Sequence, residues 1–207
     1  MAKHWQPALD QADVTISDRQ TVYDGFFKMQ KLQLSHATFA GEVVEVSREI
    51  FLRDDAVCVL LYDAPEDQVV MVEQFRVGAL DHPRSPWLLE LVAGIVEPGE
   101  SPEQVARREA MEEAGAVLGE VVPITRYMVS PGGASEYIEL LCAQVSAKGL
   151  GGIHGLAEEG EDIQVHCFDA SVLFAMVADG QIDNAAAIIA LQWLQLNRAD
   201  LQQRWIE

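Results

Sequence analysis

The sequence has few basic residues. Lys and Arg number 14 against 33 Asp and Glu among its 207 residues, which gives a formal net charge of −19. Proteins that bind duplex nucleic acid need clustered Lys and Arg to displace counterions, so we expect no nucleic acid partner. The same deficit argues against binding to an anionic membrane surface. No apolar run reaches the roughly 18 residues of a membrane span, so we expect no membrane partner.

Cysteine is also scarce. Cys58, Cys142 and Cys167 are far apart, each lies in an apolar run typical of a strand, and no Cys-x-x-Cys occurs. We therefore expect three buried free thiols and neither a zinc site nor a redox motif. The first residues, Met-Ala-Lys-His-Trp-Gln-Pro, lack an apolar signal region, so a cytoplasmic protein is expected.

The length and the remaining composition, 49% apolar and 23% charged, suit one well-buried domain with a smaller lobe. Residues 1–20 are polar and are expected to be loosely held. Strands are predicted at Thr21–Leu34 and Glu42–Arg53, separated by a glycine-containing turn. Residues 1–53 are therefore predicted to form a small N-terminal β lobe.

From residue 54 onward the pattern becomes more apolar, and β-rich runs alternate with turn signals. Asp169 is expected to cap a helix over 170–178, and Asp183 a second helix over 184–197 with an apolar face. This arrangement predicts an α+β or α/β sandwich over residues 54–207. The predicted strands are 56–62, 68–76, 87–92, 121–129, 137–145 and 163–168.

Residues 94–116 contain a well-marked helix. Ser101 is a good N-cap, Pro102 suits the first helical position, and Gln104 completes a capping box. Gly115 is a natural residue for the helix end. These signals predict a helix over 102–114.

The predicted helix carries carboxylates at regular spacing. Glu109 and Glu113 are four residues apart and share a face, and Glu112 lies close to that face. Arg108 precedes Glu112 by four residues and can pair with it. Carboxylates in this arrangement suit a hard divalent cation such as Mg²⁺. A solvated acidic face would account for a Glu-rich helix alone, but not for the fixed positions of these residues.

The segment matches the Nudix box, G-x5-E-x7-R-E-U-x-E-E-x-G-U with U apolar, at every fixed position from Gly94 to Ala116. Ala110 and Ala116 are small for the apolar positions. The resemblance implies hydrolysis of a nucleoside diphosphate linked to another group, with Mg²⁺ or Mn²⁺ as the cofactor. It also implies the Nudix fold, an α/β/α sandwich with a mixed sheet between helices.

The chain further resembles the ADP-ribose pyrophosphatase branch of that family. Pro131 follows Gly115 by the sixteen residues typical of the branch, and the stretches 87–94, 130–136, 155–162 and 182–186 also look like it. The resemblance implies hydrolysis of ADP-ribose to AMP and ribose 5-phosphate. Alternatives are a pyrophosphatase for other sugars such as ADP-glucose or GDP-mannose, a non-catalytic ADP-ribose-sensing domain, and, from charge alone, a cation buffer.

The same resemblance assigns roles to individual residues. It implies metal ligation by the Ala93 carbonyl, Glu109, Glu113 and Glu161, with Arg108 and Glu112 in support. Glu159 matches the general base in a glycine-flanked acidic loop, with Glu158 as its rival and a solvated loop as the plain alternative. It also implies a homodimer with exchanged N-terminal lobes that shares the adenine site. The implied substrate-binding residues are Phe26, Arg48, Glu49, Arg53, Arg76, Ile95, Ser130, Pro131, Gly132 and Glu136.

Overall fold

The computed structural model describes residues 4–206. The chain divides into two compact units, one formed by Met1–Asp54 with Met128–Glu136 and the other by Asp55–Tyr127 with Tyr137–Glu207. Each unit contains its own sheet, so the two are described separately.

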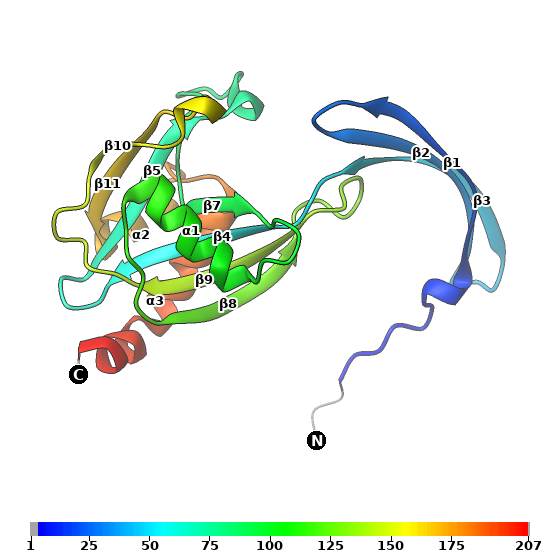
Figure 1. Ribbon diagram of the computed structural model, residues 1–207. Coiled ribbons are helices and arrows are strands. Elements are labelled where there is room, and N and C mark those ends of the chain that lie inside the picture. Colours follow the sequence, from blue (N-terminus) through cyan, green and yellow to red (C-terminus); the bar gives the residue numbers. More distant parts are fainter. Residues whose placement is uncertain (1–3, 207) are drawn as a thin grey trace. The chain divides into compact units, whose positions relative to one another are not determined.

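The first unit is built on an antiparallel sheet of β1 (Val14–Asp24), β2 (Lys28–Ala37) and β3 (Val43–Leu52), which Figure 1 shows as strongly curved. The expected strand Thr21–Leu34 is wrong. The chain reverses between Asp24 and Lys28, where the Gly25 N–H donates to the Phe27 carbonyl at 3.0 Å. The expectation that residues 14–20 are loosely held is also wrong, because they pair with β2.

One face of this sheet carries a row of apolar side chains, interspersed with Arg19, Gln30, His36 and Arg48. The pairing register places these side chains on a common face, because directly opposite residues on antiparallel strands point the same way. Leu32 is buried, with 8% of its surface exposed, whereas Val14 and Ile16 are nearly half exposed. The apolar residues on this face are Val14, Ile16, Leu32, Leu34, Val44, Val46 and Ile50.

The second unit has a mixed sheet in the order β10-β11-β5-β4-β9-β8, with β6 paired to β5 and β7 to β4. The pair β4–β9 is parallel, and β4 is antiparallel to β5 and β7. The strands are β4 (Ala56–Asp63), β5 (Gln68–Phe75), β6 (Trp87–Glu90), β7 (Val92–Ile95), β8 (Val121–Met128), β9 (Tyr137–Gln144), β10 (Gly152–His154) and β11 (Ile163–Asp169).

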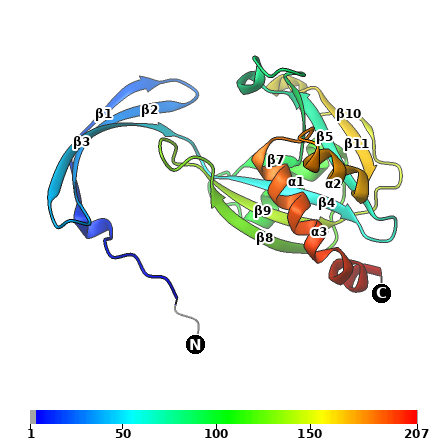
Figure 2. The same ribbon diagram turned by 180° about the vertical axis from the view of Figure 1, so that it is seen from behind.

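Helices cover both faces of this sheet. In Figure 1, α1 (Pro102–Ala114) lies in front of it, and the reverse view of Figure 2 brings α2 (Ala170–Ala178) and α3 (Ala185–Ile206) to the front. Short 3-10 helices follow β5 and precede β11, namely η2 (Val77–Ala79) and η3 (Ala157–Glu159). The predicted α/β/α sandwich of the Nudix fold is confirmed.

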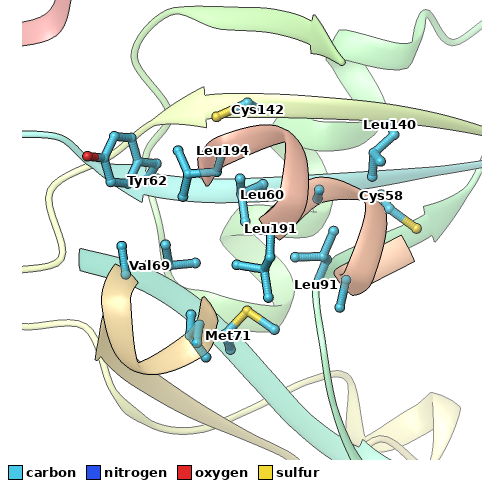
Figure 3. Packing of buried hydrophobic residues seen from close by; sticks show 14 of the residues in the cluster. Cys58, Leu60, Tyr62, Val69, Met71, Leu91, Leu140, Cys142, Leu191 and Leu194 are labelled. Carbon is cyan, nitrogen blue, oxygen red and sulfur yellow. The ribbon is translucent and has the colours of Figure 1, made fainter. Parts of the chain in front are cut away.

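Two apolar clusters hold these layers together. One joins the sheet to α2 and α3, and Figure 3 shows Leu191 and Leu194 of α3 packed against Leu60 of β4, with Met71 and Leu91 beside them. The other joins the opposite face of the sheet to α1. Within residues 4–206 the three cysteines form no disulfide, and Cys58 and Cys142 are buried while Cys167 is half-buried. Within residues 4–206, no helix has the length and apolar character needed to cross a membrane.

Several expected element boundaries change. The strand expected over 87–92 is split into β6 and β7, β10 was not expected, and α3 extends beyond 197 to Ile206. The Asp183 cap is wrong: Asn184 Oδ1 accepts the Ala187 N–H at 3.1 Å, while Asp183 pairs with His82 at 2.7 Å. Asp169 makes no side-chain capping bond to α2.

Candidate active site

Helix α1 begins and ends where its local sequence predicts. Ser101 accepts the Gln104 N–H, and the Gln104 side chain accepts the Ser101 N–H, so the capping box is complete. Gly115 ends the helix with a left-handed φ of 61°, a conformation that glycine adopts at little cost. The helix therefore presents the box carboxylates at a fixed rotation toward the sheet.

Arg108 forms ion pairs with three of the box carboxylates. Its guanidinium lies 3.0 Å from Glu100, 2.6 Å from Glu109 and 3.4 Å from Glu112. It also donates to the Ile95 carbonyl at 3.4 Å. Glu100 and Glu109 raise the pKa of Arg108, and the bond to Arg108 lowers the pKa of Glu100. Arg108 thus fixes one side of the cluster, as expected for a supporting role.

Glu113 is the most deeply buried of these carboxylates, with 3% of its surface exposed. Burial raises its pKa to about 8, and the nearby charges of Glu109 and Glu161 add to the rise. One oxygen accepts the Ala93 N–H at 3.1 Å, which opposes the shift. The pKa of Glu109 is also raised, chiefly by burial, against the lowering effect of Arg108. Burial therefore disfavours the charged form of both carboxyls in the absence of a cation.

Gly94 on β7 lets α1 approach the sheet. A Cβ at this position would overlap the Glu109 carboxylate, so any larger residue would displace that side chain. Gly94 pairs with Val57 of β4, which faces α1. The glycine of the box thus has a steric reason, because the carboxylate lies directly against the β7 backbone.

The acidic cluster fits a divalent cation in its chemistry. Its donors are carboxylate and carbonyl oxygens, the ligands that Mg²⁺ takes in proteins. In residues 4–206, however, no three acidic, His or Cys side chains already form a complete cage. Glu109 is turned onto Arg108, and Glu161 accepts the Leu156 N–H at 3.0 Å. Mg²⁺ often uses one or two carboxylates and retains several waters, so an incomplete cage is compatible with it.

Arg76 lies at the end of β5 beside this cluster. Its charge is close enough to Glu113 to lower that carboxylate's pKa, and its Nε donates to Glu90 at 2.6 Å. Glu90 was missed from the sequence. The sequence could have indicated it, because Glu90 is the single acidic residue in the apolar run Trp87–Val92, and a fully buried strand would carry none.

The expected catalytic loop contains η3. Glu159 is its last residue and Gly160 follows it, but the Glu159 side chain lies outside the described part of the chain. Glu158 is exposed. The choice of Glu159 as the general base therefore stays a prediction. Glu161, two residues on, lies close enough to Glu113 and Glu109 to affect the pKa of both.

The remaining expected substrate residues, apart from Ile95 and Arg76, lie in the first unit. Phe26 is 85% exposed and makes an edge contact with Phe27. Arg53 pairs with the buried Glu136 at 3.0 Å, and its guanidinium lies 5.1 Å from the centre of the Phe27 ring. Through Phe27, these contacts link three of the expected substrate residues, Phe26, Arg53 and Glu136.

The other candidates of this unit are less closely connected. Arg48 and Glu49 are exposed on β3, and Arg48 Nη1 donates to the Ser47 carbonyl at 2.9 Å. Ser130 begins a tight turn in which its carbonyl accepts the Gly133 and Ala134 N–H groups. Pro131 and Gly132 are exposed at the tip of this turn. A turn and a ligand contact are both compatible with this geometry.

Comparisons with known proteins place the chain in a family. The NUDIX domain profile matches residues 52–206. The ADP-ribose pyrophosphatase of Escherichia coli (strain K12) is 47% identical, covering 93% of each chain, and that of Haemophilus influenzae is 48% identical, covering 94% of this chain and 92% of the relative. The GDP-mannose pyrophosphatase of Shigella flexneri is 31% identical, covering 89% and 96%.

A solved structure of an ADP compounds hydrolase has the same fold, with a TM-score of 0.67 and 21% identity, and covers 92% of this chain and 97% of that one. The domain match spans most of the chain, and the relatives at 47–48% identity match it almost end to end. The chain therefore belongs to the Nudix family, in its ADP-ribose pyrophosphatase branch.

Proposed function

We propose that this protein hydrolyses the pyrophosphate bond of ADP-ribose to AMP and ribose 5-phosphate. The observation that carries the proposal is the near end-to-end similarity to ADP-ribose pyrophosphatases at 47–48% identity, against 31% for a GDP-mannose pyrophosphatase. A sensing domain that binds without cutting is disfavoured, because every fixed carboxylate of the box is present and three of them, Glu100, Glu109 and Glu112, pair with Arg108.

The cofactor is a divalent cation, which we assign as Mg²⁺ with Mn²⁺ as a substitute. Glu109, Glu113, Glu161 and the Ala93 carbonyl would hold it, since burial disfavours the charged forms of Glu109 and Glu113 in the free protein and a bound cation would stabilise them. When bound, such a cation draws charge from the phosphate oxygens and lowers the pKa of water.

The side chains of this protein supply the remaining chemistry. Arg76 binds a phosphate oxygen, and Arg108 fixes Glu109 and Glu112 in place. Glu159 takes a proton from the attacking water, and the oxygen of that water bonds to one phosphorus. The bond from that phosphorus to the bridging oxygen breaks, and the released phosphate carries the charge. Phe26 and Arg48 stack on the adenine, for which an aromatic ring and a planar guanidinium are suited. Glu49, Arg53, Ile95, Glu136 and the turn Ser130–Gly132 complete the substrate contacts.

The first unit supports a homodimer. Its sheet has a face with a row of apolar side chains, of which Val14 and Ile16 remain nearly half exposed, and a sheet needs such a face covered to be stable. We assign that cover to a second copy of the chain, through exchanged N-terminal lobes of residues 1–53. Light scattering at micromolar concentration tests this, because a species of 22.8 kDa alone would remove the dimer and leave the hydrolase proposal standing. The three free thiols support a reducing, cytoplasmic compartment.

A product assay tests the function itself. Purified protein is incubated with ADP-ribose, ADP-glucose or GDP-mannose, with Mg²⁺ or with a chelator, and the nucleotide products are separated. We expect AMP and ribose 5-phosphate from ADP-ribose in the presence of Mg²⁺, with a lower kcat/KM for the other two sugars. Faster cleavage of GDP-mannose would reverse the substrate assignment, and no cleavage of any of them would support a binding role.

A further inference from the structure

Gln74 is a buried amide with an unpaired donor. It lies on β5 with 6% of its surface exposed, and its Nε2 atom finds no hydrogen-bond partner within the described residues. An unpaired buried donor costs free energy, so such a group in a folded protein calls for an explanation.

The strand pairing shows which way Gln74 faces. Side chains alternate along β5, so Gln74 lies on the same face as Val72, which belongs to the cluster packed against α1. Directly opposite residues also share a face, and β6 places Leu88 opposite Gln74 and Glu90 opposite Val72. Arg76 follows two residues later and bonds to Glu90. The amide therefore lies on the α1 side of the sheet, between Arg76 and Val72.

Two carboxylates on this side of the sheet already accept other hydrogen bonds. One Glu90 oxygen accepts from Arg76, and one Glu113 oxygen accepts from the Ala93 N–H. Arg76 is close enough to Glu113 to lower its pKa, so this part of β5 borders the carboxylate cluster. The unpaired Gln74 N–H lies on the strand that ends next to Arg76, near the carboxylates proposed to bind the cation. An anionic oxygen of the substrate can accept a hydrogen bond from such a donor.

We infer that Gln74 is a substrate-binding residue whose side-chain amide donates a hydrogen bond to a non-bridging oxygen of the diphosphate, next to the oxygen bound by Arg76. This inference rests on the proposed function and adds a specific contact to it. The donor is unpaired in the free protein because its partner arrives with the substrate.

The contact predicts opposite effects on stability and activity. Met has a side chain of similar length without the amide, so Gln74→Met removes the unpaired donor and leaves the unfolding temperature unchanged or higher. The same change removes a hydrogen bond to a charged oxygen, which corresponds to about a ten- to hundred-fold loss in kcat/KM. Gln74→Glu keeps the shape but places a carboxylate beside the phosphate, and its loss is at least as large.

The experiment measures kcat and KM for ADP-ribose with Mg²⁺, together with the thermal unfolding midpoint, in the wild-type protein, Gln74→Met and Gln74→Glu. Gln68→Met is the matched control, because it makes the same change at the other end of β5, where Gln68 bonds to Asp169. We expect its kcat/KM to stay within two-fold of the wild type.

The outcomes separate the inference from the proposed function. An active wild type with an equally active Gln74→Met overturns the inference alone. A Gln74→Met variant that unfolds several degrees earlier, with activity lost only through unfolding, indicates a structural amide and also overturns it. A wild type that does not cleave ADP-ribose overturns both.

Discussion

Replacing Gly94 with alanine tests the contact between β7 and α1. The added Cβ would lie 1.7 Å from a Glu109 carboxylate oxygen, which must withdraw by about 2 Å to reach an ordinary contact distance of 3.4 Å or more. That carboxylate is held at 2.6 Å from Arg108, so it cannot move without disturbing the rest of the cluster. Overpacking of this kind costs about 1–3 kcal/mol of stability.

A misplacement of about 1 Å at a reacting centre can lower the rate about a hundred-fold. We therefore expect Gly94→Ala to fold, to unfold a few degrees earlier, and to lose about a hundred-fold in kcat for ADP-ribose. The assay is steady-state release of AMP well below the unfolding temperature, with circular dichroism to verify the fold. Gly78→Ala is the control, because a Cβ there meets nothing within 4 Å and the residue is exposed.

A double variant assigns the loss to Glu109. In a Glu109→Ala background the obstructed carboxylate is gone, so Gly94→Ala should cause no further loss of kcat. Wild-type turnover in Gly94→Ala would refute the steric argument. So would a second hundred-fold loss in the double variant, because it would show that Gly94 acts through something other than Glu109.

Three further predictions concern the buried carboxyl Glu113, the expected base Glu159 and the cap of α3. Glu113→Gln should lower kcat by orders of magnitude yet raise the unfolding temperature at pH 7.5 in chelator, because the pKa of Glu113 in the folded protein, about 8, lies above its value in the unfolded chain. That stability gap should close toward pH 5, because the carboxyl then becomes protonated in the unfolded chain as well, where its pKa is near 4.5; a constant gap would mean a different cause. Glu159→Gln should lower kcat about a hundred- to ten-thousand-fold with a small change in KM, whereas Glu158→Gln should matter little, and the reverse order would move the base by one residue. Asn184→Ala should cost about 1–2 kcal/mol, because Asn184 caps α3 and donates to the Leu89 carbonyl at 2.8 Å. Asp183→Ala should cost less than about 1 kcal/mol, because its ion pairs are exposed, and a larger loss there would restore Asp183 as the cap.

Local signals predict α1 and its charged face well. The Ser101 capping box, Pro102 and Gly115 act within a few residues of each other, so the helix bounds 102–114 follow from the sequence alone. The pairing of Arg108 with Glu112 likewise follows from their spacing of four residues. The helix over 170–178 was also predicted at its observed bounds.

The elements that were missed depend on contacts between distant residues. Short β10 has no periodic pattern of its own and forms through its pairing with β11. The run at Trp87–Val92 splits because β6 pairs with β5 and β7 pairs with β4, which a continuous apolar run does not reveal. The first hairpin was missed because Gly25 interrupts a run in which polar and apolar residues mix on both strands.

The depth of the site depends on tertiary packing in the same way. The box spacing gives Glu113 its place on α1, but the packing of β7 against that helix buries it and raises its pKa. Gln74 belongs to no motif, and in an apolar strand it would pass as an edge residue. Gln74 breaks the rule that buried polar groups are hydrogen-bonded, and burial disfavours the charged form of Glu113. A sequence optimised for stability alone would replace them, since an apolar residue at 74 or a neutral one at 113 removes an unfavourable term. Their common location, on the facing surfaces of α1 and β5 beside Arg76, is what a site prepared for a divalent cation and a diphosphate requires, because those ligands supply the charges and acceptors that the free protein lacks.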